Sequence, residues 1–315
     1  MTCFAQGSRS SLSYIEETTF GTTPGGNFTD LPFSTHSLNL TKDRVAGNDI
    51  QADRMPRGDR HGNRQTGGYI VVDLRKGDFD DLLRSAMLNN WDTTPTGADS
   101  DDVLLVGTTP VYLSIEDYAA DIDQARLFTG CAVSTMAVSI APNQMVTTTF
   151  GIVGKDMTIS QTQKAQDAAS GNAPFDSYSG DVGIGTVGGS TSPLAIVTGI
   201  DFTLNNSFAP TFVVGDDAAP CLEVGRAEVE GTLTAYFEDA ALINRFLNET
   251  ETILSVSVDD PTGSNAYTFY FPRVKINSAD AGVDGPNSRI INMSFVALYD
   301  STAGSNLVIK RPETA

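Results

Sequence analysis

The feature that most constrains the fold is a strand followed by an amphipathic helix in residues 68–88. Apolar side chains alternate with others from Ile70 to Leu74, the period of a β-strand. From Phe79 to Met87 they recur at i, i+3, i+4, i+7 and i+8, which predicts a helix with one buried face. Asp78 precedes this run and is predicted to cap the helix by accepting a free backbone N–H.

The same order returns in residues 231–247, where a strand over 231–237 leads into a helix over 238–247. Alternating runs that end near Leu40 and Leu204 precede the two copies, and three further strands follow each. The expected strands are 110–115, 127–134 and 145–153 in the first copy, and 253–258, 267–276 and 289–298 in the second. The sequence therefore predicts a mainly β chain of two tandem units, each with one flanking helix. We place the units at 1–159 and 181–315, with a linker at 160–180 that is rich in Gln, Ala, Ser and Gly.

Net charge and cysteine content exclude several classes of protein. The 315 residues carry 39 acidic against 20 basic side chains, a formal charge of −19, which would repel a nucleic-acid backbone. Three widely spaced cysteines do not make a disulfide framework, so reduced thiols are expected. The chain begins without a basic, then apolar, leader and has no apolar run near 20 residues. We expect a soluble protein with no export signal and no membrane anchor.

Residues 41–67 form a basic stretch in this acidic chain. They lack sustained periodicity, which predicts a long loop, and such a loop is usually functional or disordered. Four acids accompany its basic side chains, so the stretch carries +2 and the rest of the chain −21. It is either a solvated flexible excursion or an arm that contacts the acidic surface of another copy. The basic residues are Lys42, Arg44, Arg54, Arg57, Arg60 and Arg64.

No motif in the sequence predicts catalysis, a cofactor or a metal site. His36 and His61 have no nucleophile motif beside them. The glycine-rich 183–188 precedes an alternating run rather than a helix, which indicates a turn between strands. Adjacent carboxylates are typical of turns in an acidic β protein, and residues 280–285 lack the ligand spacing of a calcium loop. Residues 89–102, with Trp91, are predicted to be an exposed insertion, and 310–315 a loose tail.

Several short stretches, taken in order, resemble one known family. They are Tyr14–Pro24, Ile50–Arg54, Gly77–Leu83, Asn172–Phe175, Glu228–Thr234 and Phe295–Asp300. Together they resemble the major tail tube proteins of long-tailed, non-contractile (siphovirus-type) bacteriophages. The resemblance implies β-sandwich or partial-barrel units, and rings that stack into a tube whose lumen passes DNA. It also implies tape-measure, tail-tip and tail-terminator proteins as partners, a place in the virion tail, and assembly in the cytoplasm of the host.

The resemblance and the duplication together give three expectations. Family members commonly carry one unit and form six-membered rings, so two units per chain predict trimeric rings with pseudo-sixfold symmetry. The basic loop is expected to contact the next ring. Alternation along the strands points four acids away from the core, and these are expected to line the lumen: Asp73, Asp201, Glu228 and Glu230. Two other interpretations stay open, an acidic tandem β-sandwich that serves as a binding or adhesion module, and a glycan hydrolase that uses paired carboxylates.

Overall fold

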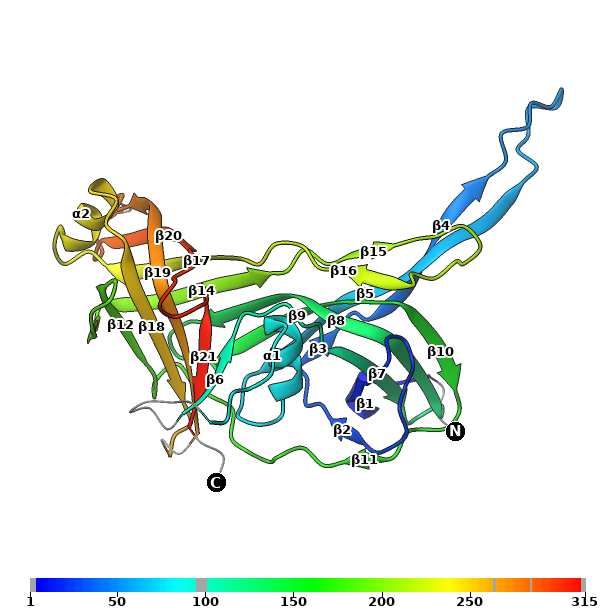
Figure 1. Cartoon of the computed structure of the whole chain (residues 1–315), viewed down its shortest axis with the longest axis horizontal. Helices are drawn as coiled ribbons and strands as arrows, with labels where there is room; N and C mark the ends of the chain where they lie inside the picture. The colour runs from blue at the N-terminus through cyan, green and yellow to red at the C-terminus, as the bar shows by residue number, and fades with distance from the viewer. Residues whose placement is uncertain (1–3, 95–100, 263–264, 284, 313–315) are drawn as a thin grey trace.

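The computed structural model describes residues 4–94, 101–262, 265–283 and 285–312, which form a mainly β protein with two α-helices (Figure 1). The first part contains a short 3-10 helix (Gly7–Arg9), β1 (Ser10–Glu17), β2 (Phe28–Asp30), β3 (Thr35–His36), β4 (Asn39–Ala46), β5 (Asp59–Asp73), α1 (Asp80–Met87), β6 (Asp102–Leu105), β7 (Tyr112–Ala119), β8 (Gln124–Ile140), β9 (Thr147–Gly154) and β10 (Asp156–Ser160). The second part contains β11 (Gln166–Asp167), β12 (Asp181–Thr186), β13 (Thr191–Pro193), β14 (Val197–Asn205), β15 (Ala209–Thr211), β16 (Cys221–Glu223), β17 (Glu228–Tyr236), α2 (Ala241–Leu247), β18 (Thr252–Asp259), β19 (Ala266–Asp280), β20 (Ile290–Ala297) and β21 (Val308–Arg311). The predicted fold class is confirmed.

The two units have the same strand order. In the first, neighbouring strands pair in the order β4, β5, β9, β8, β7 and β1. In the second, the order is β14, β17, β20, β19, β18 and β12. Because each position of one list has its counterpart in the other, the helix after β5 and the helix after β17 are also equivalent.

Even the irregularities of the two units coincide. The pairing of β8 with β9 shifts between Val133 and Thr135, and that of β19 with β20 shifts between Ile276 and Ser278. The second pair of positions follows the first by the same interval, 143 residues. Such bulges bend a strand. Beyond its bulge β8 leaves β7 and pairs with β9 and β14, so the sheet curves without closing into a barrel.

One apolar core extends through both units. Every second side chain of β9 is buried, which is the alternation expected when one face of a strand covers a core. In the second unit the ring of Phe202 packs edge-on against those of Phe269 and Phe271, each at 5.0 Å between centroids. Helix α1 buries its apolar face against this core, and full burial of such a side chain contributes about 1.5–3 kcal/mol.

The predicted cap of α1 is wrong. Phe79 occupies the N-cap position, and no side chain caps the helix there. Asp78 lies one residue too early, and its carboxylate accepts the backbone N–H of Ser170 at 2.6 Å instead. The local sequence places an acidic residue near the start of the helix, but its carboxylate binds the backbone of a distant segment of the chain instead.

The predicted linker is held against the body rather than hanging free. Phe175 is fully buried, and its backbone bonds to Leu74 and Val146 at 2.8 and 2.9 Å. β11, within the same stretch, pairs with β2. The units also share the pairings of β14 with β8 and of β21 with β6. The boundaries 1–159, 160–180 and 181–315 stay a prediction.

Candidate assembly surfaces

The four acids predicted to face away from the core lie on one face of a continuous sheet. Directly opposite residues in an antiparallel pair project to the same face. A row of such residues crosses seven strands, and all its side chains are small or acidic. The row is Asp73, Thr147, Ser139, Asp201, Thr232, Ser294 and Ser278. Glu228 and Glu230 alternate with core residues of β17 and share the face of Thr232.

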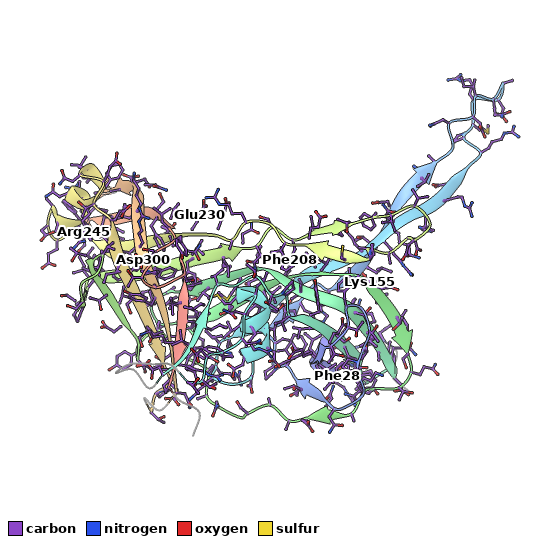
Figure 2. All side chains as sticks on the ribbon, in the orientation of Figure 1. Phe28, Lys155, Phe208, Glu230, Arg245 and Asp300 are labelled. Carbon is purple, nitrogen blue, oxygen red and sulfur yellow. The ribbon has the colours of Figure 1, made fainter. Side chains whose placement is uncertain are left out.

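Part of this acidic face is hollowed. A shallow pocket of about 400 Å³ lies over β14, β17, β19 and β20, with Asp201 and Glu230 in its lining. Ser139 Oγ donates to the carboxylate of Asp201 at 2.5 Å, across the strand pair β8–β14. Gly231 lies beneath the pocket, where a Cβ would come within 2.4 Å of the Phe295 ring and 2.6 Å of the Asp201 carbonyl oxygen. A larger residue at 231 would force these strands apart. Figure 2 marks Glu230 on this part of the sheet.

The basic stretch is a β-hairpin, so the predicted structureless loop is wrong. β4 and β5 pair from Asn39 opposite Gly67 to Ala46 opposite Asp59, and residues 47–58 join them. The hairpin projects away from the rest of the molecule (Figure 1). Sequence periodicity could not reveal it because its side chains are exposed on both faces, so no apolar alternation is required.

The six basic side chains of the hairpin differ in their partners. Arg64, at its root, lies 3.2 Å from Asp156 and 3.3 Å from Asp217. Arg44 pairs with Asp59, and Arg57 with Asp53, within the exposed hairpin. The other three, Lys42, Arg54 and Arg60, are exposed and form no ion pair with any residue that the structure describes. Three cations of the hairpin therefore have no ion-pair partner within the described part of the chain.

The second unit has an equivalent arm, residues 206–227, which lies on the first unit. Phe208 and Leu222 of this arm are buried against Leu88 and Ala132. Figure 2 marks Phe208 where the arm crosses the first unit. Asn206, which is 1 % exposed, donates its side-chain amide to Ala86 O at 2.7 Å, beside the end of α1. Besides the pairing of β21 with β6, the two units are thus joined by the pairing of β14 with β8 and by this arm.

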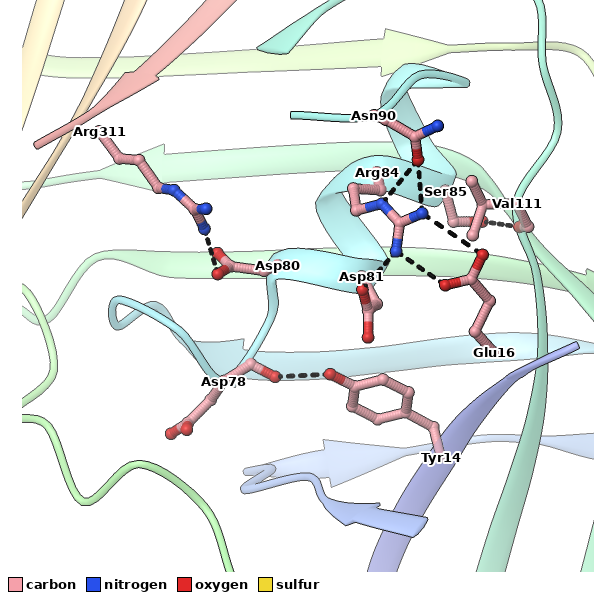
Figure 3. Close-up of polar contacts among 10 residues, drawn as sticks. All are labelled: Tyr14, Glu16, Asp78, Asp80, Asp81, Arg84, Ser85, Asn90, Val111 and Arg311. Carbon is pink, nitrogen blue, oxygen red and sulfur yellow. Dashed lines mark hydrogen bonds and ion pairs between the residues drawn. The ribbon is translucent and has the colours of Figure 1, made fainter. Parts of the chain in front are cut away.

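A network of charges braces α1 against both ends of the chain (Figure 3). Arg84 donates to Glu16 of β1 and to Asp81, each at 2.8 Å. From the other unit, Arg311 of β21 binds Asp80, and its Nε lies 2.8 Å from Asp102. Residues 308–311 form β21, which pairs with β6, so the predicted loose tail is wrong for residues 310 and 311. Residues 313–315 lie outside the described residues.

Arg311 also explains the position of Trp91. The guanidinium lies 4.1 Å from the centre of the Trp91 ring, which stacks on Tyr267. Trp91 packs against the core, so the exposed insertion predicted at 89–102 is wrong at this residue; 95–100 lie outside the described residues. Burial alone would lower the pKa of Arg311, but the charge of Asp80 and hydrogen bonds to Asp102 and Asp80 raise it above its ordinary value.

We expect Arg311→Met to lower the free energy of unfolding by about 3–5 kcal/mol, because it removes the cation that binds the buried carboxylate of Asp102. Denaturant unfolding of the unassembled protein measures the change. The matched control is Arg226→Met, whose 85 % exposed side chain lies 3.7 Å from Glu228 and whose loss should cost under about 0.5 kcal/mol. Equal effects of the two substitutions would contradict the bracing role.

The residues that could serve as metal ligands are scattered in the described part of the chain. His36 lies 3.6 Å from Asp117, and no three His, Cys, Asp or Glu in this part of the chain are grouped as metal ligands. The turn between strands predicted at 183–188 is wrong for residues 183–186, which lie in β12 instead, and only 187–188 of this stretch belong to the turn to β13. Asp284, within the stretch compared with a calcium loop, is outside the described residues. No described helix has the length and apolar character needed to cross a membrane.

Comparison with known protein families gives a match that spans both units. Residues 7–297 match the family described as phage tail tube protein. A search of curated proteins found no match to the chain. The match covers the acidic face, the basic hairpin and the seam between the units, and ends at the last residue of β20.

Proposed function

The chain belongs to the phage tail tube proteins, and from this structural role we propose that it polymerises into stacked rings that form the tail tube of a siphovirus-type phage. DNA passes through the lumen of this tube into the host. The subunits assemble in the host cytoplasm around a tape-measure protein, between a tail-tip and a tail-terminator protein. The protein acts through its surfaces and catalyses no reaction.

The acidic face of the sheet is the observation that carries this proposal. A lumen must let DNA slide without holding it, and each Lys or Arg that meets a phosphate releases counterions and favours binding. The row of small and acidic residues across seven strands contains no base. Lys275 shares this face one row away, and its ammonium is paired with Glu249 at 2.7 Å. Asp73, Asp201, Glu228 and Glu230 line the tube interior and repel the DNA without sequence preference.

The basic hairpin connects successive rings. It extends beyond the body of the subunit and carries the exposed Arg54, Arg57 and Arg60 on a molecule whose net charge is −19. Arg64 supports the root of the hairpin from within the same chain. Lys42 and Arg44 lie on β4, nearer the root of the hairpin.

Negative-stain microscopy of the purified protein at rising concentration tests the proposed function. Regular tubes or rings are the expected result. Monodisperse molecules that bind to a glycan array would instead favour an adhesion module, and turnover of a glycan would favour a hydrolase. Either result, without tubes, would overturn the proposal.

We expect three chains per ring. Ring closure constrains the number of equivalent units, and the two units of this chain repeat one strand order, so three chains supply six positions. Cryo-microscopy of assembled tubes, reconstructed without imposed symmetry, should give threefold rings with a pseudo-sixfold inner wall. A ring of six chains would contradict this stoichiometry and would place one unit of each chain outside the wall.

A further inference from the structure

The seam inside one chain shows how one unit binds the next. β14 of the second unit pairs antiparallel with the far half of β8, with Leu204 opposite Met136 and Asn205 opposite Thr135. The backbone N–H of Asn206 continues the ladder to Ser134 O at 2.8 Å. The arm that follows then lies on the first unit.

The strands that form this seam have counterparts elsewhere in the chain. The repeated strand begins at residue 68 in the first unit and at residue 231 in the second, so the preceding residues, Gly67 and Glu230, are equivalent. Asn39 of β4 lies opposite Gly67, and Thr203 of β14 lies opposite Glu230, so β4 corresponds to β14. Lys42 thereby corresponds to Asn206. The shared bulges make β19 the counterpart of β8. The arm of residues 42–64, which contains the outer parts of β4 and β5, and the arm of residues 206–227, which follows β14, have nearly equal length.

These counterparts are unpaired on the edges that the seam uses. Within the described residues, β4 pairs only with β5, and Ser278, Ala279 and Asp280 pair only with β20. Figure 1 places β4 and β19 at opposite ends of the molecule, so they cannot meet within one chain. An open strand edge is a template for pairing with another chain.

We propose that β4 of one copy pairs with the end of β19 of a second copy in the register of the internal seam. This inference rests on the proposed function and specifies the contact that closes each ring. Transferring the register places Leu40 opposite Ala279 and Thr41 opposite Ser278 of the second copy. The contact joins two different edges, so it repeats head to tail, as a ring requires.

The second copy also has a pocket near the expected position of Lys42, the residue that corresponds to Asn206. Asn206 binds the carbonyls of Ala86 and Val133, which are next to the end of α1 and before the β8 bulge. The corresponding positions, Phe246 and Ile276, line an open pocket of about 300 Å³ together with Glu249 and Lys275. Lys42 carries three donors and a positive charge where Asn206 has a neutral amide.

The pocket already contains an ion pair, between Lys275 and the 73 % exposed Glu249 at 2.7 Å, so in this placement Lys42 shares the carboxylate of Glu249 with Lys275. Lys42 forms no ion pair with the described residues of its own chain. The exposed Leu247, also in the pocket lining, is available to cover the aliphatic stem of the lysine. Strand pairing and the lysine contact thus use the same pocket edge.

Disulfide trapping in assembled tubes tests the register. Thr41 and Ser278 correspond to Asn205 and Thr135, which lie between hydrogen-bonded positions, where opposing side chains approach most closely. We replace Cys3 and Cys221 by Ser, and then mix one variant carrying Thr41→Cys with another carrying Ser278→Cys. Mild oxidation of the mixed tubes should link the two variants, while each variant alone should give no linked product. A control mixture of Thr41→Cys with Asp280→Cys, two residues out of register, should link about tenfold less.

The outcomes separate this inference from the proposed function. Linkage in register, with little in the control, supports it. Tubes that link equally or better out of register, or that do not link, overturn the inference and leave the tube function standing. Linkage of Thr41→Cys to itself would indicate symmetric pairing of β4 and would also overturn it. If the cysteine variants do not form tubes, Ala279→Pro in the otherwise natural chain decides. In the register of the seam, the N–H of Ala279 points towards β4 of the neighbouring copy, and proline has no N–H to donate. The variant should therefore fold but form no tubes. Normal tubes would overturn the inference.

Discussion

Tubes are expected to disappear when Arg54, Arg57 and Arg60 are all reversed to Glu, while the subunit stays folded. All three side chains are exposed on the projecting hairpin, so the substitutions remove no core contact. At the contact with the next ring they convert attraction to repulsion. With about 1 kcal/mol for each exposed pair, the loss is about 3 kcal/mol per chain, or roughly 100-fold in the concentration needed for assembly. Sedimentation and negative-stain microscopy measure that concentration.

Two controls make this prediction specific. The triple Arg→Lys variant keeps the charge and should still form tubes, although lysine lacks the planar fork of arginine. The defect of the Glu variant should be larger at low salt, where exposed charges are screened less. Circular dichroism should show the same secondary structure in all three proteins. Undiminished polymerisation of the Glu variant would return the hairpin to a solvated excursion without a role in assembly.

Genome passage is expected to slow or stall when Asp73, Asp201, Glu228 and Glu230 are all replaced by Lys. The charge of each chain then becomes more positive by eight units, all on the face that we place in the lumen. Every ring would present cations to the phosphates, and each contact adds a counterion-release gain that retains the DNA. DNA release from purified virions, triggered and followed by dye fluorescence, measures the rate. Tubes should remain intact, because these acids lie outside the core and the hairpin.

The salt dependence of release distinguishes binding of DNA from damage to the tube. Retention by phosphate contacts weakens steeply as salt rises, so release from the Lys variant should recover at higher salt. The matched neutral variant, with Asn for Asp and Gln for Glu, should release DNA at close to the natural rate. Normal release from virions verified to carry the Lys variant would defeat the lumen assignment. So would a tube map that places these side chains on the outer surface.

The sequence by itself determined the units and their faces. Alternation fixed β5, β17 and their neighbours, because a half-buried strand must alternate apolar and polar side chains. The spacing from Phe79 to Met87 fixed α1 for the same reason at the helical period. Alternation also put the four acids on the face opposite the core, since each lies an odd number of residues from a buried neighbour. These properties depend on short segments and on burial alone.

Only the tertiary structure decided what depends on distant residues. The hairpin of residues 41–67 is held by backbone pairs between exposed strands, which leave no apolar pattern to detect. Arg311 and Asp102 are 209 residues apart, and their ion pair turns a predicted loose tail into a brace. The seam of β14 with β8 depends on a bulge that frees the far half of β8 from β7. Local propensity cannot specify such pairings, because the curvature of the whole sheet determines which strands meet.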